Sequence, residues 1–401
     1  MKIGLIKERK TPPDRRVVFT PEHLERLEKK YKDLKFIVEP SDIRIFTVDA
    51  YMEKGIEVNA DLSDCDVLLG VKEVPIDALI PDKSYFFFSH TIKMQPYNRN
   101  LLKAILDKNI KLYDHEVITN KNDSRLIGFG RYAGLVGAYN GFRALGLRDG
   151  LFNLNKVENL PDLNAVKNEL DKISIPTMKI CLTGKGKVGY GAKEILDYLK
   201  IKEVSATDYL NKNFEEVVYT HIDFLDYNKL KETTGARKGK SHFYEHPEAY
   251  KSDFMKYAKV TDFFIAGHYY GEGAPYLITK EDTKSADFKI NLIADVSCDI
   301  DGPIASTIRP STIADPFYGY DAEKEKEVSF DADNAITVMA VDNLPCELPK
   351  DASEGFGDMF EKHVIPAFFN NDKDGILERA LMTSEGELTQ RYSYLQEFVD
   401  E

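Results

Sequence analysis

The stretch MKICLTGKGKVGYGAKEIL, residues 178–196, decides the fold of this chain. Its glycines Gly184, Gly186 and Gly189 have the spacing G-x-G-x-x-G, after an apolar strand-like segment and before a segment with helical periodicity. A strand, a glycine turn and a helix in this order are typical of a dinucleotide-binding loop, because the glycines permit a tight turn, close approach of a pyrophosphate and helix–strand packing. We therefore predict that phosphates are held at the helix N-terminus by Gly184, Gly186, Lys187, Val188 and Gly189.

An acidic residue follows this loop at the distance that such a site requires. Asp208 lies about twenty residues after the last glycine, at the end of a second short strand predicted over 203–207. A carboxylate at this place accepts hydrogen bonds from the adenosine ribose and repels a 2′-phosphate. The sequence therefore favours NAD as the cofactor, with NADP still possible because Lys212 is close to Asp208.

A rival glycine-rich segment lies upstream, over residues 128–146. Gly128, Gly130 and Ala133 also fit G-x-G-x-x-A, but no acidic residue ends a strand about twenty positions later. The small residues continue at helical spacing, which predicts a helix packed closely against a neighbour. The polar residues that follow, 151–177, are expected to form a connector.

The bulk composition predicts a globular protein of two or three domains. The chain has 401 residues, of which 43% are hydrophobic and 30% charged. The net charge of -13 argues against a nucleic-acid partner, and four scattered cysteines without a C-x-x-C pair argue against a zinc site or a disulfide framework. No metal is expected. The start MKIGLIKERK lacks the apolar stretch of a signal peptide, and no apolar run is long enough to span a membrane. We therefore expect a cytoplasmic protein that binds small molecules. The sequence leaves the oligomeric state open.

Alternation of strands and helices predicts an α/β fold with two Rossmann-like domains, parallel sheets and an active-site cleft between the domains. The expected substrate domain is 1–138, completed by helical residues 349–401, and the expected dinucleotide-binding domain is 139–348. A polar stretch over 223–252 without clear periodicity is expected to be a surface loop rather than a lid.

Polar residues gather where the predicted strands of the first domain end. Lys72 and Glu73 follow one apolar strand and His90 follows the next, and ligands of open parallel sheets bind at such carboxyl ends. Further candidates in nearby loops are Arg16, Glu116 and Arg125. In the second domain, apolar strands are followed by Asp295, Asp342 and Asn343, which are expected either to line the nicotinamide end of the cleft or to cap the following turns.

Several stretches resemble the saccharopine dehydrogenase (lysine-forming) family and, within it, the lysine–2-oxoglutarate reductase half of the bifunctional lysine-degrading enzyme; alanine dehydrogenases are more distant relatives with the same plan. The resemblance runs in order through RRVVFTPEH, VKEVP, YFFFSHTIKMQPYN, RLIGFGRYAGLVGA, FYEHPEAY, LIADVSCDIDGPI and VDNLPCELPKDASEGFGDMF. It implies a pyridine-nucleotide enzyme that joins lysine to 2-oxoglutarate or splits the resulting secondary amine, saccharopine. The alternatives are an alanine dehydrogenase-like amino-acid dehydrogenase and a nucleotide-sensing protein without turnover.

The resemblance also implies roles for the candidate residues. Lys72 and His90 fall on the family's acid–base pair, and the remaining positions fall on residues that bind the substrate, namely Arg16, Glu73, Glu116 and Arg125. A lysine acts as a base only where desolvation or a neighbouring cation lowers its pKa. We therefore expect Glu73 either to point away from Lys72 or to be balanced by an arginine.

Overall fold

The computed structural model describes residues 1–232, 238–271 and 273–401. It divides into two compact units, Met1–Phe129 with Pro349–Glu401, and Gly130–Leu348. The division lies before the expected boundary at residue 138 because helix α4 (Gly130–Arg148) is continuous and its small residues pack within the second unit.

The first unit is built on a six-stranded parallel sheet with the order β3-β2-β1-β4-β5-β6. Its strands are β1 (Lys2–Leu5), β2 (Lys35–Val38), β3 (Glu57–Val58), β4 (Val67–Leu69), β5 (Ser84–Phe87) and β6 (Lys111–Asp114). The chain moves outward from β1 to β3 and then returns to β4 on the other side of β1. The topological switch point therefore lies between β1 and β4, where doubly wound sheets bind ligands.

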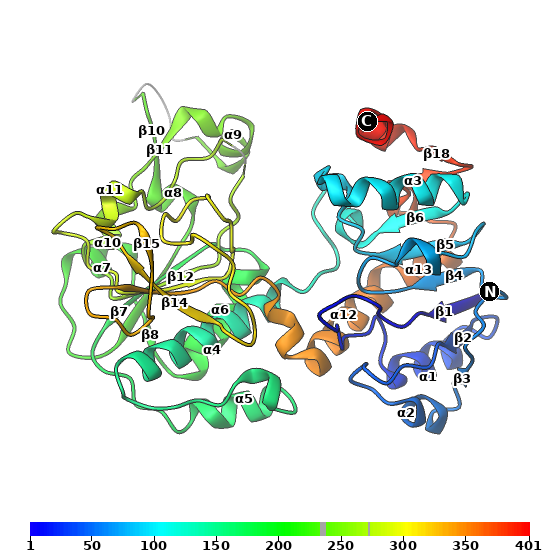
Figure 1. Ribbon diagram of the computed structural model, residues 1–401, viewed down its shortest axis with the longest axis horizontal. Helices are drawn as coiled ribbons and strands as arrows, with labels where there is room; N and C mark the ends of the chain where they lie inside the picture. Colours follow the sequence, from blue (N-terminus) through cyan, green and yellow to red (C-terminus); the bar gives the residue numbers. More distant parts are fainter. Residues whose placement is uncertain (233–237, 272) are drawn as a thin grey trace. The chain divides into compact units, whose positions relative to one another are not determined.

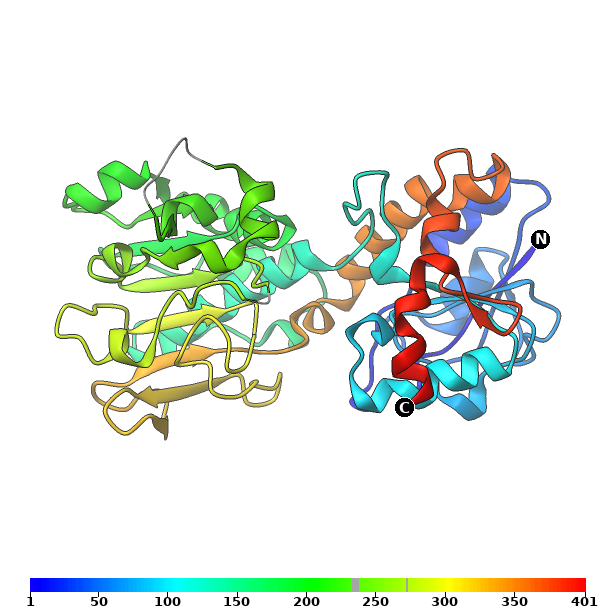
Figure 2. The same ribbon diagram turned by 90° about the horizontal axis from the view of Figure 1, so that it is seen from above.

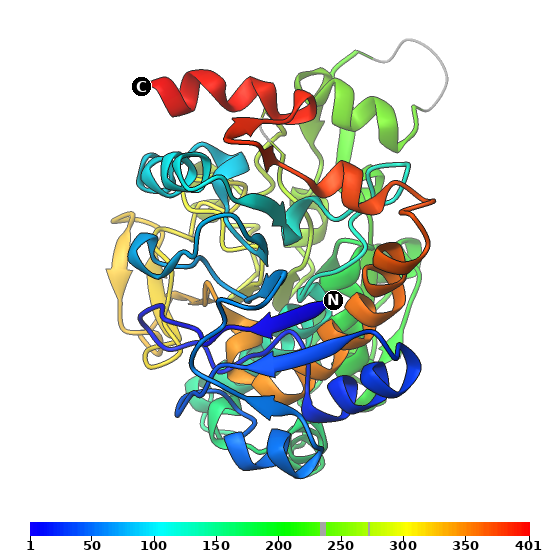
Figure 3. The ribbon, with the colours of Figure 1, turned by 90° about the vertical axis from the view of Figure 1, so that its right-hand side faces the viewer.

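Helices cover both faces of this sheet (Figures 1 and 3). They are α1 (Pro21–Lys30), α2 (Val48–Glu53), α3 (Arg99–Asp107), α12 (Pro349–His363), α13 (Ile365–Phe369), α14 (Ile376–Ala380) and α15 (Gln396–Asp400), with a short hairpin of β17 (Thr383–Ser384) and β18 (Glu387–Leu388). The predicted start of α1 is confirmed, since Thr20 accepts a hydrogen bond from the N–H of His23 and Pro21 is the first helical residue.

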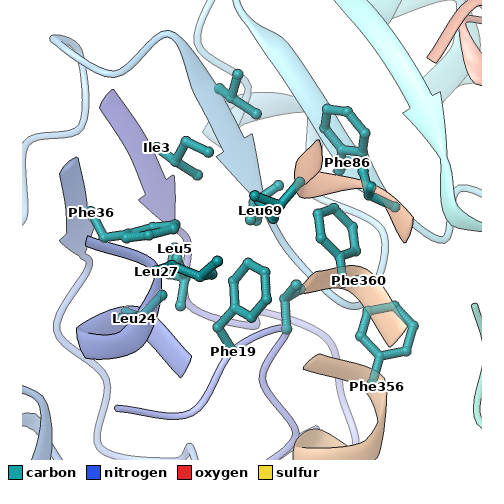
Figure 4. Close-up of a cluster of buried hydrophobic side chains, with 14 of the residues drawn as sticks. Ile3, Leu5, Phe19, Leu24, Leu27, Phe36, Leu69, Phe86, Phe356 and Phe360 are labelled. Carbon is teal, nitrogen blue, oxygen red and sulfur yellow. The ribbon is translucent and has the colours of Figure 1, made fainter. Parts of the chain in front are cut away.

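Two hydrophobic cores form because alternate strand residues point to opposite faces. On one face Ile3, Leu5 and Phe86 pack against α1 and α12, as Figure 4 shows. Residues of the opposite parity, such as Tyr85 and Phe87, pack on the other face with α3 and the C-terminal segment. Burial on both faces leaves the strand ends as the place where charged side chains can gather.

The second unit contains an eight-stranded sheet with the order β15-β14-β16-β13-β12-β7-β9-β8 (Figure 2). Six strands are parallel: β7 (Lys179–Thr183), β8 (Lys202–Glu203), β9 (Val218–Ile222), β12 (Phe263–Ala266), β13 (Leu292–Asp295) and β16 (Ile336–Met339). The two strands at one end of the sheet, β14 (Phe317–Asp321) and β15 (Lys326–Val328), form antiparallel pairs.

The helices of the second unit include one inside the expected connector. They are α4, α5 (Leu163–Leu170), α6 (Lys187–Tyr198), α7 (Ala206–Asn211), α8 (Phe224–Tyr227), α9 (Lys240–Glu245), α10 (Met255–Ala258) and α11 (Lys280–Thr283). The polar stretch 223–252 also has structure, since it carries α8, α9 and a hairpin of β10 (Asn228–Leu230) and β11 (Tyr250–Ser252). Residues 233–237 of that stretch lie outside the described residues.

The rejected glycine segment forms helix α4, as its spacing predicted. A Cβ on Gly134 would lie 1.9 Å from the carbonyl oxygen of Val188 in α6, and one on Gly141 would lie 2.5 Å from the ring of Phe263. Glycine is required here because α4 approaches α6 and the sheet so closely. Across the described part of the chain, the model contains no helix with the length and apolar character of a membrane span.

Candidate active site

The structure gathers three predicted site residues at the carboxyl edge of the first sheet. Lys72 and Glu73 follow β4, and His90 follows β5, the strand next to it. The two chain extensions remain hydrogen-bonded beyond the strands, because the N–H of Phe88 donates to the carbonyl of Val71 at 3.0 Å. Since β4 also neighbours β1 at the switch point, this edge is the ligand-binding edge of the sheet.

The imidazole of His90 lies between two carboxylates. Its Nδ1 is 3.1 Å from Oε2 of Glu116, and its Nε2 is 3.9 Å from Oε1 of Glu73. The ring also stacks on Phe88, with 6.1 Å between ring centroids. The carboxylate of Glu116 on one side of the ring fixes the orientation of the imidazole.

Glu116 is surrounded by cations. Besides His90, Arg125 Nη2 lies 3.2 Å and Lys93 Nζ 3.6 Å from its Oε1, and Arg125 Nε donates to its main-chain carbonyl at 3.1 Å. Burial raises the pKa of this carboxyl, but His90, Lys93 and Arg125 outweigh burial and lower the pKa to about 2. Glu116 therefore supplies a permanent negative charge beside His90.

Asp114, the last residue of β6, ties the loops of His90 and Glu116 together. Its carboxylate accepts the N–H of Ser89 at 3.0 Å and the N–H of Glu116 at 2.7 Å, together with the Ser89 hydroxyl. Burial raises the pKa of Asp114 to about 6, although these hydrogen bonds oppose the rise. The result is a fixed geometry for the residues on either side of the imidazole.

Glu73 is balanced by a lysine, which corrects the expectation of an arginine. Lys10 Nζ lies 2.8 Å from Oε2 of Glu73. The other oxygen, Oε1, faces His90, is buried and has no hydrogen-bond partner among the described residues.

The two predicted carboxylate-binding arginines are in different situations. Arg16 is buried, and its Nε and Nη2 donate to Asp14 at 3.0 and 2.6 Å while its guanidinium lies 4.2 Å from the ring centroid of Phe129. Burial raises the pKa of Asp14, but Arg16 outweighs burial and lowers it. Asp14 occupies this edge of Arg16, and the role of Arg16 in substrate binding stays a prediction. Arg125 is 47% exposed along its side chain and lies at the rim.

One carboxylate that the sequence did not single out, Glu8, holds the segment of Lys72. Its Oε1 accepts the N–H of Val71 at 2.7 Å, and its Oε2 accepts the N–H of Lys72 at 2.9 Å. Glu8 follows β1, so these bonds cross the switch point to the extension of β4. The rule that selected Lys72 and His90, a charged residue after a parallel strand, also applies to Glu8.

In the second unit, the glycine loop has the geometry of a phosphate-binding turn. Gly184 has a φ of 91°, and a Cβ on it would lie 2.4 Å from the carbonyl oxygen of Gly267. A Cβ on Gly189 would lie 1.7 Å from the carbonyl oxygen of Gly184, so helix and turn touch. A Cβ on Gly186 would meet no atom within 4 Å. Of these three glycines, only Gly186 has room for a side chain within the protein. The space beside its backbone fits a ligand that approaches closely.

The predicted phosphate-binding helix begins directly after this turn. Gly186 is the N-cap of α6, without a side-chain cap, and Lys187 is its exposed first residue. Val188 is half-buried and packs against α4. The helix N-terminus is therefore open to an anion, as dinucleotide binding requires.

Asp208 does not end a strand, which corrects its predicted place. The strand β8 stops at Glu203, Ser205 then caps α7, and Asp208 lies inside that helix, where it pairs with Lys212 at 2.9 Å. The strand adjacent to β7 is β9 instead, and Asp223 follows it immediately. The N–H of Gly184 donates to the carbonyl of Ile222 at 3.0 Å, which puts Asp223 next to the glycine turn.

The residues predicted at the nicotinamide end differ in their exposure to solvent. Asp295 is fully buried and accepts hydrogen bonds from the N–H groups of Ser297 and Cys298 and from the hydroxyls of Ser297 and Thr307. Burial raises its pKa, although these bonds oppose the rise. Asp295 therefore caps its turn, which is the second of the two roles expected for it from the sequence. Asp342 and Asn343 lie after β16, exposed and half-buried respectively.

A pocket with aromatic walls lies over the loops that follow β9 and β12, the two strands beside β7. This aromatic pocket has a volume of about 370 Å³. Its lining is Phe243, Tyr244, Pro247, Tyr269, Gly271 and Ala274. Tyr244 and Tyr269 are 51% and 77% exposed, so two rings can take up a flat partner.

Comparison with known proteins finds a family model that matches part of the chain. Residues 4–136 match the model described as alanine dehydrogenase/PNT, N-terminal domain. The protein is 29% identical to the mitochondrial alpha-aminoadipic semialdehyde synthase of Mus musculus, over 96% of this chain and 46% of that protein. It is 26% identical to a saccharopine dehydrogenase (NAD(+), L-lysine-forming) of Candida glabrata, over 90% of this chain and 93% of that protein.

These matches confirm the resemblance read from the sequence, although the chain spans only about half the length of the first of these relatives. The fold is similar to solved structures of an L-alanine dehydrogenase (TM-score 0.65, 17% identity, 100% of this chain and 99% of that one) and of a transhydrogenase from Sinorhizobium meliloti (TM-score 0.62, 14% identity, 97% and 100%). The predicted α/β fold with parallel sheets is confirmed. The matched residues 4–136 include Lys72, Glu73, His90 and Glu116, at the edge described above.

Proposed function

We propose that this protein is a pyridine-nucleotide-dependent oxidoreductase acting on a secondary amine. It would split saccharopine with water into lysine and 2-oxoglutarate, or join these two in the reverse reaction. The observation that carries the proposal is the pair Lys72 and His90, on hydrogen-bonded extensions of neighbouring parallel strands beside the switch point. The homology to an L-lysine-forming saccharopine dehydrogenase supports this substrate.

Lys72 serves as the base in this proposal. The amine nitrogen of the substrate must be neutral before hydride leaves the adjacent carbon, so its proton has to be removed first. Lys72 is half-buried, and its main chain is fixed by Glu8 at the ligand-binding edge. Its neighbour in sequence, Glu73, is paired with Lys10.

His90 serves in the second half of the reaction, when water adds to the imine and the resulting carbinolamine breaks down. Each step moves a proton to or from oxygen or nitrogen, and an imidazole can do both near neutral pH. Glu116 at Nδ1 orients the ring, while Nε2 remains on the side of Glu73, away from that bond. Glu73 and Glu116 thus stabilise the protonated ring that one direction of the reaction requires.

Arg125 is proposed to bind a carboxylate of the 2-oxo acid. It is exposed along half its side chain, and its partner Glu116 also has His90 and Lys93, so Arg125 can turn to a substrate without leaving Glu116 uncompensated. Arg16, which is paired with Asp14, is the other arginine proposed for the substrate. Two arginines suit a dicarboxylate, because each can form charge-assisted hydrogen bonds to one group.

The second unit is proposed to hold the dinucleotide. The glycine turn and the N-terminus of α6 would bind the pyrophosphate, and Asp223 would accept hydrogen bonds from the adenosine ribose. The aromatic pocket, formed by loops after the strands on both sides of β7, would take the adenine ring. A carboxylate at the ribose favours NAD over NADP. When bound, the nicotinamide supplies the acceptor or donor of hydride.

A second candidate is an alanine dehydrogenase-like amino-acid dehydrogenase, which would release ammonia rather than a second amino acid. The match of residues 4–136 to the alanine dehydrogenase/PNT domain favours it. A monocarboxylate such as alanine would use only one of Arg16 and Arg125. A third candidate, a nucleotide-sensing protein, would bind the dinucleotide through the same glycine turn without turnover.

A spectrophotometric assay separates these candidates. Oxidation of NADH and NADPH is followed with 2-oxoglutarate plus lysine, ornithine or ammonia, and with pyruvate plus ammonia. Turnover that requires both lysine and 2-oxoglutarate supports the proposal, and faster turnover with pyruvate and ammonia would replace it with the alanine dehydrogenase-like activity. NADH binding without oxidation in any mixture would favour the sensing protein. The cytoplasmic location expected from the sequence stays a prediction.

A further inference from the structure

The main chain from Gly70 to Lys72 is held by hydrogen bonds from three sides. The imidazole Nε2 of His115 lies 2.9 Å from the carbonyl oxygen of Gly70, and the N–H of Phe88 donates to the carbonyl of Val71 at 3.0 Å. On the side of β1, the Glu8 carboxylate accepts both N–H groups at the end of the segment. Of these contacts, the bond from Glu8 reaches Lys72 itself.

The fit between the extensions of β1 and β4 is close. The N–H of Ile6 donates to the carbonyl of Leu69 at 3.0 Å. A Cβ on Gly70 would lie 2.8 Å from Cδ1 of Ile6 and 3.6 Å from Oε1 of Glu8. A side chain at position 70 would therefore displace the terminal methyl group of Ile6 and would contact the Glu8 carboxylate.

Glu8 is placed among charges from every neighbouring segment. Asp14 and Arg16 act on it from its own chain extension, Arg44 from the segment before α2, and Lys72 through its main-chain N–H. Arg44 is buried and donates to the carbonyl of Ile6 at 3.3 Å. Burial raises the pKa of Glu8 to about 7; Asp14 adds to the rise, whereas the N–H groups of the Lys72 segment and Arg16 oppose it.

We propose that Glu8 is a positioning residue for the base Lys72, and that its ionised carboxylate is the form that holds the lysine segment in place. A carboxylate accepts two N–H groups at once, whereas a protonated carboxyl presents one oxygen that is a donor and loses one of the two bonds. Protonation of Glu8 then loosens the main chain at Val71 or Lys72. This inference rests on the proposed function, because Lys72 is the base only in that reaction.

A carboxylate that is withdrawn from water costs free energy even when it is hydrogen-bonded. A glutamine in its place avoids the charge but presents its NH2 group to one of the two N–H groups. Catalysis supplies the reason, because displacement of a reacting group by about 1 Å can cost about 10²-fold in rate. The Glu8 carboxylate therefore fixes the position of the Lys72 segment and lowers the stability of the fold.

The test compares Glu8→Gln with Glu39→Gln as a matched control. Glu39 follows the neighbouring strand β2, is buried and also accepts a backbone N–H, that of Lys7 at 2.8 Å, but it does not touch the Lys72 segment. Amide hydrogen exchange of the peptide containing residues 70–73 is measured at pH 8. We expect exchange to become roughly tenfold faster in Glu8→Gln and to remain unchanged in Glu39→Gln, since only the first loses these bonds.

The kinetic arm uses the same two variants with lysine, 2-oxoglutarate and NADH. Glu8→Gln should lower kcat by about 10- to 100-fold with little change in KM, and should lack the fall in kcat that the wild-type protein shows as pH drops below about 7. Glu39→Gln should retain both kcat and the pH profile. Wild-type exchange at residues 70–73, corrected for its intrinsic pH dependence, should also rise below pH 7, which requires no variant.

Two results would overturn the proposal. Unchanged exchange in Glu8→Gln would show that the carboxylate does not hold the segment, and faster exchange with unaltered kcat and pH profile would show that holding it does not matter for Lys72. A wild-type protein without turnover in any mixture would instead refute the proposed function. The exchange measurement would then still decide whether Glu8 anchors the main chain.

Discussion

The N–H of Phe88 donates to the carbonyl of Val71 at 3.0 Å, one residue before Lys72 and two residues before His90. This bond extends the pairing of β4 and β5 beyond the strands and fixes the spacing of the two proposed catalytic segments. Each segment is also held by a carboxylate from a neighbouring strand: Glu8, after β1, accepts the N–H of Lys72, and Asp114, the last residue of β6, accepts the N–H of Ser89. Glu8 and Asp114 thus bind main-chain N–H groups of the two segments that carry the proposed catalytic residues.

The glycine turn predicts opposite effects for two neighbouring substitutions. Gly186→Ala places a methyl group where no atom lies within 4 Å, so the fold should keep its melting temperature while NADH affinity falls at least about tenfold, because the pyrophosphate needs that space. Gly189→Ala places a methyl group 1.7 Å from the carbonyl oxygen of Gly184 and should lower the melting temperature strongly. Calorimetric titration with NADH and thermal unfolding measure the two effects. Unchanged NADH affinity in Gly186→Ala would remove the turn from the cofactor site.

Cofactor preference should depend on Asp223 and not on Asp208. Asp223→Asn removes the negative charge beside the predicted ribose site, and the ratio of kcat/KM for NADH to that for NADPH should fall about tenfold or more. Asp208→Asn is the control, because that side chain lies in α7 and pairs with Lys212. If this ratio is the same in the wild type and Asp223→Asn but changes in Asp208→Asn, the ribose is bound by Asp208, as the spacing in the sequence predicted.

The strand ends of the first unit were predictable because parallel strands end at one edge, so charged residues after apolar runs come together whatever their separation in sequence. Lys72 and His90 were found in this way. The start of α1 followed from local chemistry, a hydroxyl cap at Thr20 followed by Pro21. Glu8 was missed because it stands in a run of charged residues, Lys7 to Lys10, where nothing distinguishes a buried carboxylate from exposed ones.

The second unit shows where spacing alone fails. The acidic residue was sought at the usual distance after the glycines, but α7 and the edge strand β8 precede the strand that pairs with β7, so the adjacent strand end is at Asp223. Asp295 ends a strand as predicted, yet its oxygens cap a turn, which depends on hydrogen bonds from Ser297 and Thr307. The end of a strand can be predicted from the sequence, and it tells where a side chain lies. Whether that side chain can bind a ligand depends on its hydrogen bonds within the fold, which the sequence does not show.

Stability should depend on pH through Glu116. Its pKa is lowered in the folded state from the ordinary value of 4.5 to about 2, so its ion pairs stabilise the fold fully above about pH 4.5 and lose this effect as pH falls towards 2. Glu116→Gln should therefore lower the free energy of unfolding by about 1–3 kcal/mol at pH 7, and the deficit should shrink towards pH 3. Chemical denaturation at both pH values measures it. If Glu116→Gln lowers the free energy of unfolding by the same amount at pH 7 and pH 3, the ion pairs of Glu116 do not stabilise the fold as described.

Glu8 should show the opposite sign. Its pKa is raised on folding from 4.5 to about 7, so its protonated form stabilises the fold below about pH 4.5 and this contribution is lost as pH rises through 7. Relative to the wild type, Glu8→Gln should be more stable at pH 8 than at pH 5, by about 1–3 kcal/mol in the difference. Thermal and chemical unfolding at the two pH values provide the comparison, with Glu39→Gln alongside. A relative stability independent of pH would mean that Glu8 is not buried as a charge.

The most direct measurement of the central claim is the turnover of Lys72→Met. Methionine keeps the length and the apolar part of the side chain but cannot take a proton, so kcat for lysine plus 2-oxoglutarate should fall about 10²- to 10⁴-fold while the Kd for NADH, measured by fluorescence, stays the same. Lys29→Met, on the exposed face of α1, should leave both unchanged. If Lys72→Met retains kcat within a few-fold of the wild type, the base is another residue and the proposed active site is wrong.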